Sequence, residues 1–167
     1  MPHTPKKAAF SPLTVSPKKD DDKRATGFSV ELMRAVLTND EDGVLNLIDE
    51  DVDVNGLDDK GSSALHVAAF FGYESILISL IDAGARIGAR DNLWVTPLHR
   101  ACIRNNYSVV LALLERGASP RAQCKRFMTP LHLAAQNNAI KSGEILIAYA
   151  PDVIGQSLLL KLIAYLR

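Results

Sequence analysis

A spacing of 33 residues runs through most of this 167-residue chain and restricts what the chain can fold into. His66, His99 and His132 mark this spacing, because each follows the previous one by 33 positions. Each histidine ends a tetrapeptide of one pattern: Ser63-Ala64-Leu65-His66, Thr96-Pro97-Leu98-His99 and Thr129-Pro130-Leu131-His132. Self-similarity at this period indicates a stack of short repeated units, since one such unit cannot bury its apolar face alone.

Local chemistry predicts two helices in each unit. Thr96 and Thr129 are N-cap residues, and the proline after each takes the first helical position, where its missing N–H costs nothing. In the second helix, apolar residues recur at helical spacing on one face. Gly84 and Gly117 can end that helix with a positive φ. The apolar residues are Ile76, Leu77, Leu80 and Ile81 in one copy, and Val109, Val110, Leu113 and Leu114 in the next.

These features resemble the ankyrin-repeat family, whose signature is the Thr-Pro-Leu-His tetrapeptide at a 33-residue period. Leu32 and Ala35 stand one period before Leu65 and Ala68, so a degenerate first copy precedes the others. The resemblance implies an all-α solenoid of stacked helix-turn-helix pairs with short finger loops. We expect repeats at about 29–58, 59–91, 92–124 and 125–157.

Both ends of the chain differ from the repeats. Residues 1–28 hold six basic residues, three acidic ones and four of the eight prolines, a composition that predicts a disordered tail. Ser11-Pro12 and Ser16-Pro17-Lys18-Lys19 resemble sites of proline-directed kinases, so Ser11 and Ser16 are candidate modification sites. The alternative is a solvated tail that is not modified. Residues 158–167 contain eight apolar residues in ten. That segment is expected to be either a helix that caps the stack or a truncated repeat.

Composition restricts the class of partner and the compartment. Nineteen basic residues balance 19 acidic ones, which argues against a nucleic-acid partner. The N-terminus lacks the apolar stretch of a secretory signal, and no apolar run is long enough to span a membrane. Two cysteines cannot form a disulfide framework. We therefore expect a monomeric cytoplasmic or nuclear protein without membrane contact.

The residues that could carry chemistry are better explained by structure. Histidines 33 residues apart fall on three successive repeats, too far apart to bind one zinc ion, and are expected to hold turns. Cys102 replaces a packed alanine, whereas Cys124 lies in a finger beside Lys125 and Arg126, whose charges could lower its pKa. Neither cysteine has the base and oxyanion site that a catalytic thiol needs. The sequence predicts no enzyme, no cofactor and no metal site.

A binding surface is expected where the repeats differ from one another, at the finger tips and at the exposed ends of the first helices. The family usually has glycine where Trp94 and Phe127 stand. Aromatic residues and arginine are the types that anchor protein interfaces. The predicted partner-binding residues are Phe71, Trp94, Arg104, Arg126 and Phe127. The alternative for Trp94 and Phe127 is packing between neighbouring fingers.

A narrower resemblance lies within the family. Asp91–Ala101 (DNLWVTPLHRA) and Asn137–Glu144 (NNAIKSGE) are similar to the N-terminal repeats of the ankyrin-repeat regulatory subunits of serine/threonine-protein phosphatase 6. That resemblance implies a non-catalytic scaffold with a phosphatase catalytic subunit as its protein partner. The alternative function is an adaptor regulated through its tail, either as a target of proline-directed kinases or in association with chromatin.

Overall fold

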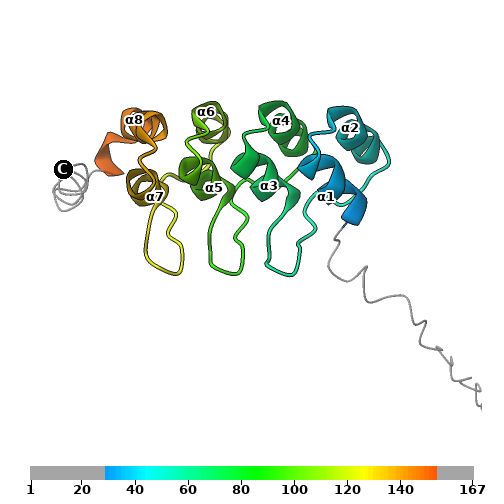
Figure 1. The fold of residues 1–167 in the computed structure, drawn as a ribbon, viewed down its shortest axis with the longest axis horizontal. Helices are drawn as coiled ribbons and strands as arrows, with labels where there is room; N and C mark the ends of the chain where they lie inside the picture. The colour runs from blue at the N-terminus through cyan, green and yellow to red at the C-terminus, as the bar shows by residue number, and fades with distance from the viewer. Residues whose placement is uncertain (1–28, 154–167) are drawn as a thin grey trace, which may run out of the picture.

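The computed structural model describes residues 29–153, which form eight α-helices and one short 3-10 helix. The helices come in pairs that stack side by side, and Figure 1 shows the first helix of every pair in one row and the second helix in another. Loops project from the row of first helices, and we call them fingers one, two and three (residues 57–63, 90–96 and 123–129). The first helices are α1 (Val30–Leu37), α3 (Ala64–Phe71), α5 (Pro97–Ile103) and α7 (Pro130–Gln136). The second helices are α2 (Glu41–Asp49), α4 (Glu74–Asp82), α6 (Tyr107–Glu115) and α8 (Ile140–Tyr149), followed by η2 (Pro151–Val153).

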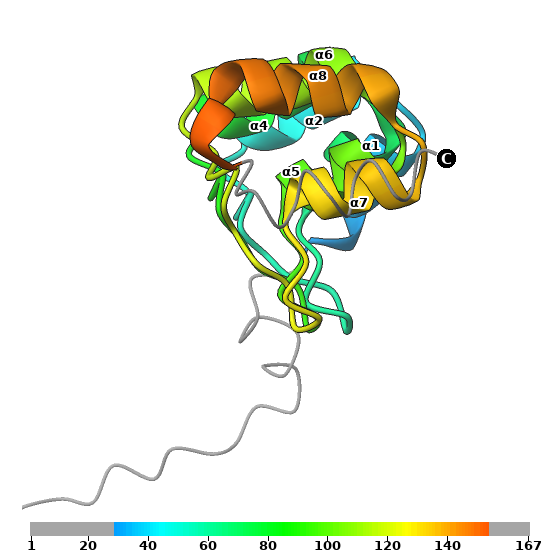
Figure 2. The same cartoon turned by 90° about the vertical axis from the view of Figure 1, so that its left-hand side faces the viewer.

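This architecture confirms the predicted all-α solenoid. Turned by 90°, the pairs lie nearly behind one another and the fingers extend together to one side (Figure 2). The degenerate first copy also forms a helix pair, because Ser29 caps α1 by accepting from the Leu32 N–H and Asp40 caps α2 by accepting from the Gly43 N–H. Each described pair falls within one of the four predicted repeats.

Each tetrapeptide starts a first helix through a reciprocal cap. In α5 the backbone N–H of Thr96 donates to Nδ1 of His99 at 3.1 Å, and the Thr96 hydroxyl lies 2.9 Å from the same nitrogen. Ser63 with His66 and Thr129 with His132 form the same arrangement. Histidine therefore takes the role that Glu or Gln has in a standard capping box.

The same histidines join neighbouring repeats. Nε2 of His66 lies 3.0 Å from the carbonyl oxygen of Val95, and Nε2 of His99 lies 3.1 Å from that of Met128. Since a carbonyl only accepts, Nε2 carries the proton and donates, which leaves Nδ1 free to accept from the helix start. The predicted role of the histidines in holding turns is confirmed for these two.

The helices end where a left-handed residue is available. Gly72 ends α3 at φ 82°, and Asn105 and Asn138 stand at φ 56° and 53° after α5 and α7. Gly84 and Gly117 follow the second helices at φ 90° and 91°, as predicted. Glycine and asparagine tolerate this region of backbone space better than other residues.

The core runs the length of the stack between the two rows of helices. Leu65, Leu98 and Leu131, one from each tetrapeptide, are each at most 1% exposed. Ala68, Ala101 and Ala134 are buried beside them. These small side chains allow the first helices to approach closely, so α3 packs on α5 and α5 packs on α7. The second helices close the core with Ile76, Leu77, Leu80, Val109, Val110, Leu113, Leu114 and Leu146.

The fourth repeat has a defect in this core. Ser142 and Gly143 stand where α4 has Ile76 and Leu77. Ser142 is fully buried, and within residues 29–153 its hydroxyl has no hydrogen-bond partner. A Cβ at Gly143 would meet only Leu131, at 3.9 Å, beside an apolar hollow of about 250 Å³ at the end of the described stack.

We expect Ser142→Val to raise the free energy of unfolding by about 1 kcal/mol, because it removes a buried hydroxyl that has lost its water and gained no partner. The measurement is a urea titration followed by circular dichroism. Ser75→Val is the matched control, because Ser75 is exposed on α4 and should give no gain. A loss of stability in Ser142→Val would show that the site cannot accept the added methyl group.

The remaining expectations for the chain ends lie outside the described residues. These are the disordered tail over residues 1–28, its candidate sites Ser11 and Ser16, and the cap or truncated repeat over residues 158–167.

Candidate functional site

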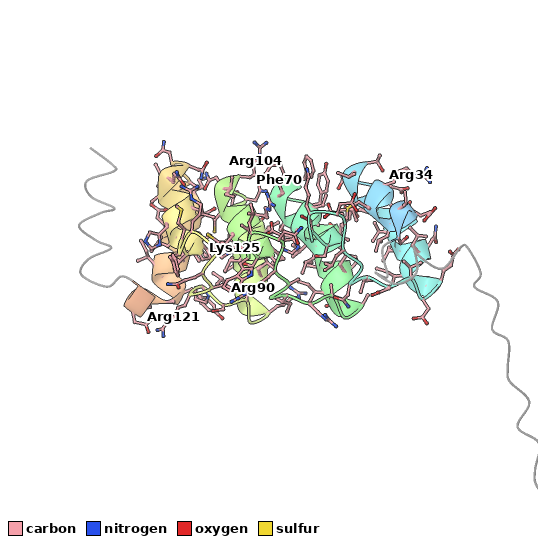
Figure 3. The ribbon with its side chains drawn as sticks, turned by 90° about the horizontal axis from the view of Figure 1, so that it is seen from below. Arg34, Phe70, Arg90, Arg104, Arg121 and Lys125 are labelled. Atoms are coloured by element: carbon pink, nitrogen blue, oxygen red, sulfur yellow. The ribbon has the colours of Figure 1, made fainter. Side chains whose placement is uncertain are left out.

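The side of the solenoid formed by the fingers and the first helices carries the residues predicted to bind a partner. Figure 3 shows this side, with Arg34, Phe70 and Arg104 along one edge, Arg90 and Lys125 in the middle, and Arg121 at the opposite edge. A hollow of about 240 Å³ lies between finger one and the first helices and is lined in part by Lys60, Phe70 and Phe71. We call this side the finger face.

Aspartates shape the first two fingers from within. Oδ1 of Asp58 accepts from the N–H groups of Lys60 and Ser62, and Oδ1 of Asp91 accepts from those of Leu93 and Val95. These two aspartates are therefore turn residues. Asp91 is also buried, and its Oδ2 forms an ion pair with Arg100 at 2.7 Å, which fixes finger two to α5.

Adjacent fingers are joined by backbone hydrogen bonds. The N–H of Asn92 donates to the carbonyl of Lys60 at 2.9 Å, and the N–H of Lys125 donates to the carbonyl of Leu93 at 2.9 Å. The Asn92 amide also donates to the Asp59 carbonyl at 3.1 Å. The fingers thus form a connected row, and side chains at their tips keep a fixed spacing.

Trp94 and Phe127 stand at equivalent places in fingers two and three, and both are exposed. The residue surface is 50% accessible for Trp94 and 78% for Phe127. Both have a left-handed backbone, with φ 61° and 57°, and Gly61 holds the same place in finger one at φ 73°. Bulky residues rarely adopt this conformation, which costs roughly 1–2 kcal/mol per residue. Phe127 buries too little surface for packing between fingers to explain its presence.

Arg104 and Phe71 belong to a separate group at the ends of the first helices. The Arg104 guanidinium lies 5.1 Å from the centre of the Phe70 ring. Phe71 is 46% exposed, stacks on Tyr73 at 5.6 Å and meets Phe70 edge-on at 5.3 Å. The five predicted residues therefore form two groups on the finger face: Trp94, Arg126 and Phe127 on the fingers, and Phe71 and Arg104 on the helix ends.

Sequence reasoning missed Arg90 and did not show that Cys124 is buried. The Arg90 guanidinium lies 5.3 Å from the centre of the Trp94 ring. Its position four residues before Trp94 was the available signal, because a tight hairpin brings such residues together. Cys124 is buried, since it occupies the register position of Asp58 and Asp91, whose side chains point into their fingers.

The groups that could perform chemistry have structural roles or are buried. Burial lowers the pKa of His66 and of His99, so both stay neutral while they bridge repeats. Burial raises the pKa of the Cys102 thiol, which disfavours the reactive thiolate. Over residues 29–153 no cluster of three or more metal-ligating side chains occurs, and no helix in that range is long and apolar enough to cross a membrane.

Comparison with known proteins gives one finding for this arrangement. A family model described as ankyrin repeats, in three copies, matches residues 32–124 and 95–157. No curated protein matches the chain.

Proposed function

The chain belongs to the ankyrin repeat family, and we propose that it is a non-catalytic module that binds a protein partner through its finger face. One observation carries the proposal: Trp94 and Phe127 are exposed aromatic residues held in a left-handed backbone. Finger one forms the same turn with Gly61. Strained residues that persist in a fold are found preferentially at binding and active sites.

The energetics of Phe127 make the argument specific. Its backbone conformation costs roughly 1–2 kcal/mol, while its exposed ring gains little from burial within the chain. A large aromatic side chain on a rigid turn is suited to a protein interface, since its apolar area is buried there at small cost in side-chain entropy. The connected finger row supplies the rigid support.

The proposal is tested by the double substitution Trp94→Ala with Arg126→Ala. A pull-down with the full chain identifies the partner, and titration of that purified partner measures its affinity. We expect the double variant to weaken binding by more than tenfold, which is about 1.4 kcal/mol, because exposed aromatics and arginines dominate interface energies. Thermal unfolding should remain cooperative. Unchanged affinity in a folded variant would contradict the proposal.

Phe127→Gly separates binding from folding more sharply. Glycine relieves the left-handed strain, which stabilises the folded chain. It also gives the unfolded chain more conformational entropy, which costs roughly 0.5–1 kcal/mol of stability. The melting temperature should therefore stay unchanged or rise, while partner binding weakens. Asn138→Gly is the matched control, since Asn138 is also left-handed but lies after α7, away from the finger tips. A clear drop in melting temperature for Phe127→Gly would assign the ring a folding role.

A narrower proposal concerns the partner. The similarity of Asp91–Ala101 and Asn137–Glu144 to phosphatase 6 regulatory subunits supports a serine/threonine phosphatase catalytic subunit as a candidate. This support rests on about twenty residues. Recovery of such a subunit with the full chain, and again after deletion of residues 1–28, would support a scaffold of that kind.

The alternative, an adaptor regulated through Ser11 and Ser16, gives the opposite result in the same experiment. Each phosphate would add about −1.5 to −2 charges to the tail. Loss of every partner on deletion of residues 1–28, with no effect of the Trp94 and Arg126 substitutions, would favour the adaptor over binding through the finger face.

A further inference from the structure

Formal charge is segregated along the solenoid. Residues 29–85 contain twelve Asp and Glu residues and two basic residues. Residues 86–137 reverse this balance, with eight Lys and Arg residues and two acidic ones. Fingers two and three belong to the second segment, so the exposed aromatic residues stand in its basic surroundings.

Neither acidic residue of the basic segment reaches the finger tips. Asp91 is buried, and its two oxygens are taken by the Arg100 guanidinium and the turn N–H groups of finger two. Glu115 is the last residue of α6, in the row of second helices on the other side of the stack (Figure 1). The surface around Trp94 and Phe127 is therefore positive, with no carboxylate from its own segment to neutralise it.

The cations fall into two classes by their partners. Arg116 lies 3.8 Å from Asp82, and Arg121 pairs with Asp152. By contrast, Arg90, Arg104, Lys125 and Arg126 form no ion pair with any carboxylate of residues 29–153. Arg90 and Arg104 instead lie over the rings of Trp94 and Phe70. Unpaired cations beside exposed apolar side chains match a ligand that combines negative charge with apolar groups.

We propose that fingers two and three bind an extended acidic segment of a partner protein, whose apolar side chains cover Trp94 and Phe127 between flanking carboxylates. This inference rests on the proposed function and names the chemistry of its partner. Neighbouring helices pack about 8–10 Å apart, and an extended chain spans about 3.3–3.6 Å per residue. The two apolar side chains of the segment should therefore be two or three residues apart.

The positive surface around Trp94 and Phe127, which we call the basic patch, is short, and its length favours a short acidic peptide segment over a nucleic acid. A single nucleic-acid strand follows a continuous positive groove through its backbone phosphates. Here the charge of the finger row changes at finger one, where the exposed Asp59 takes the place of Asn92 and balances Lys60. A long polyanion would meet Asp59 and then the other acidic side chains of residues 29–85.

The test starts from a display library of random 12-residue peptides selected on the full chain. We expect the enriched peptides to carry net negative charge and two large apolar residues two or three positions apart. A fluorescein-labelled copy of the most enriched peptide then gives a Kd by anisotropy. Raising NaCl from 0.1 to 0.5 M should weaken this Kd severalfold, because salt screens exposed charges. Enrichment of basic or uncharged peptides, or no enrichment, would overturn the inference.

Charge reversal supplies the second arm of the test. Arg90→Glu with Arg126→Glu should weaken peptide binding by at least tenfold. Arg90→Gln with Arg126→Gln should weaken it by a smaller factor. This neutral variant still tests the role of the two cations should the charge-reversed variant unfold. Arg86→Glu is the control, because Arg86 is exposed in the loop after α4, where its N–H donates to Asn55. It should change the Kd less than twofold.

Three outcomes would assign the surface differently. Loss of peptide binding in Trp94→Ala with no effect of charge reversal would overturn the acidic partner and leave the proposed function in place. Displacement of the peptide by an equal concentration of a 20-nucleotide single strand would assign the patch to nucleic acid. Sedimentation of the full chain as a salt-sensitive dimer would assign it to the acidic half of a second copy.

Discussion

Acidification below pH 6.5 is expected to lower the free energy of unfolding, with a slope of at most about 2.7 kcal/mol per pH unit, the limit for two histidines that each bind one proton fewer in the folded chain. His66 and His99 cause this effect. Burial lowers the pKa of both histidines in the folded chain below the ordinary value of 6.5. Below pH 6.5 the unfolded chain therefore binds more protons than the folded one, so stability falls with pH. The full stability is present above about pH 7.

The physical cost of protonation is visible in the hydrogen bonds. Nδ1 of His99 accepts from the Thr96 N–H while Nε2 donates to the Met128 carbonyl. A proton on Nδ1 would remove that acceptor and place a charge in a buried site, which breaks the cap at the start of α5. The His66 ring would lose the cap of α3 in the same way.

Urea titrations between pH 5 and pH 8 measure the slope, in a range where ordinary carboxylates stay ionised. His99→Gln is the informative variant, because glutamine at the third helical position can still accept from the N-cap N–H but does not titrate. It should lower stability at pH 7 and reduce the slope. An unchanged slope in the double variant His66→Gln with His99→Gln would contradict the role of these histidines.

The repeat explains how much of the fold could be predicted from sequence. Thr96-Pro97-Leu98-His99 specifies a helix start, a core position and a link to the next repeat within four residues, so copies at a fixed period determine the stack. Local chemistry was sufficient because each repeat packs only on its neighbours. Ser142 could have been found the same way, since it breaks the register of Ile76 and Val109.

The candidate site was harder to predict because it depends on departures from the repeat. Exposure of Trp94 and Phe127 followed from their place in the fingers, but their left-handed backbone did not, since residue preferences argue against it. The Arg90 contact with Trp94 required the hairpin geometry. The segregation of charge was present in the sequence, yet an overall balance of 19 against 19 conceals it.

Leu98→Ala is expected to cost roughly 2–5 kcal/mol of unfolding free energy, a large part of the 5–15 kcal/mol that stabilises an ordinary domain. Leu98 lies in α5, is 1% exposed, and stands in line with the buried Leu65 and Leu131 of the adjacent repeats. Its truncation removes apolar contacts and leaves a cavity at the centre of the stack. Because α5 packs on both α3 and α7, the change weakens two interfaces at once.

Leu93→Ala provides the matched control for this prediction, because it makes the same chemical change five residues earlier. Leu93 is 62% exposed on finger two, so its truncation should alter the free energy of unfolding by less than about 0.5 kcal/mol. Urea midpoints of the two variants, each followed by helical circular dichroism, give the comparison. Equal losses would mean that finger two is part of the folding core. A large loss confined to Leu98→Ala would show that the fingers can vary without cost to the stack, which is the property that a recognition surface needs.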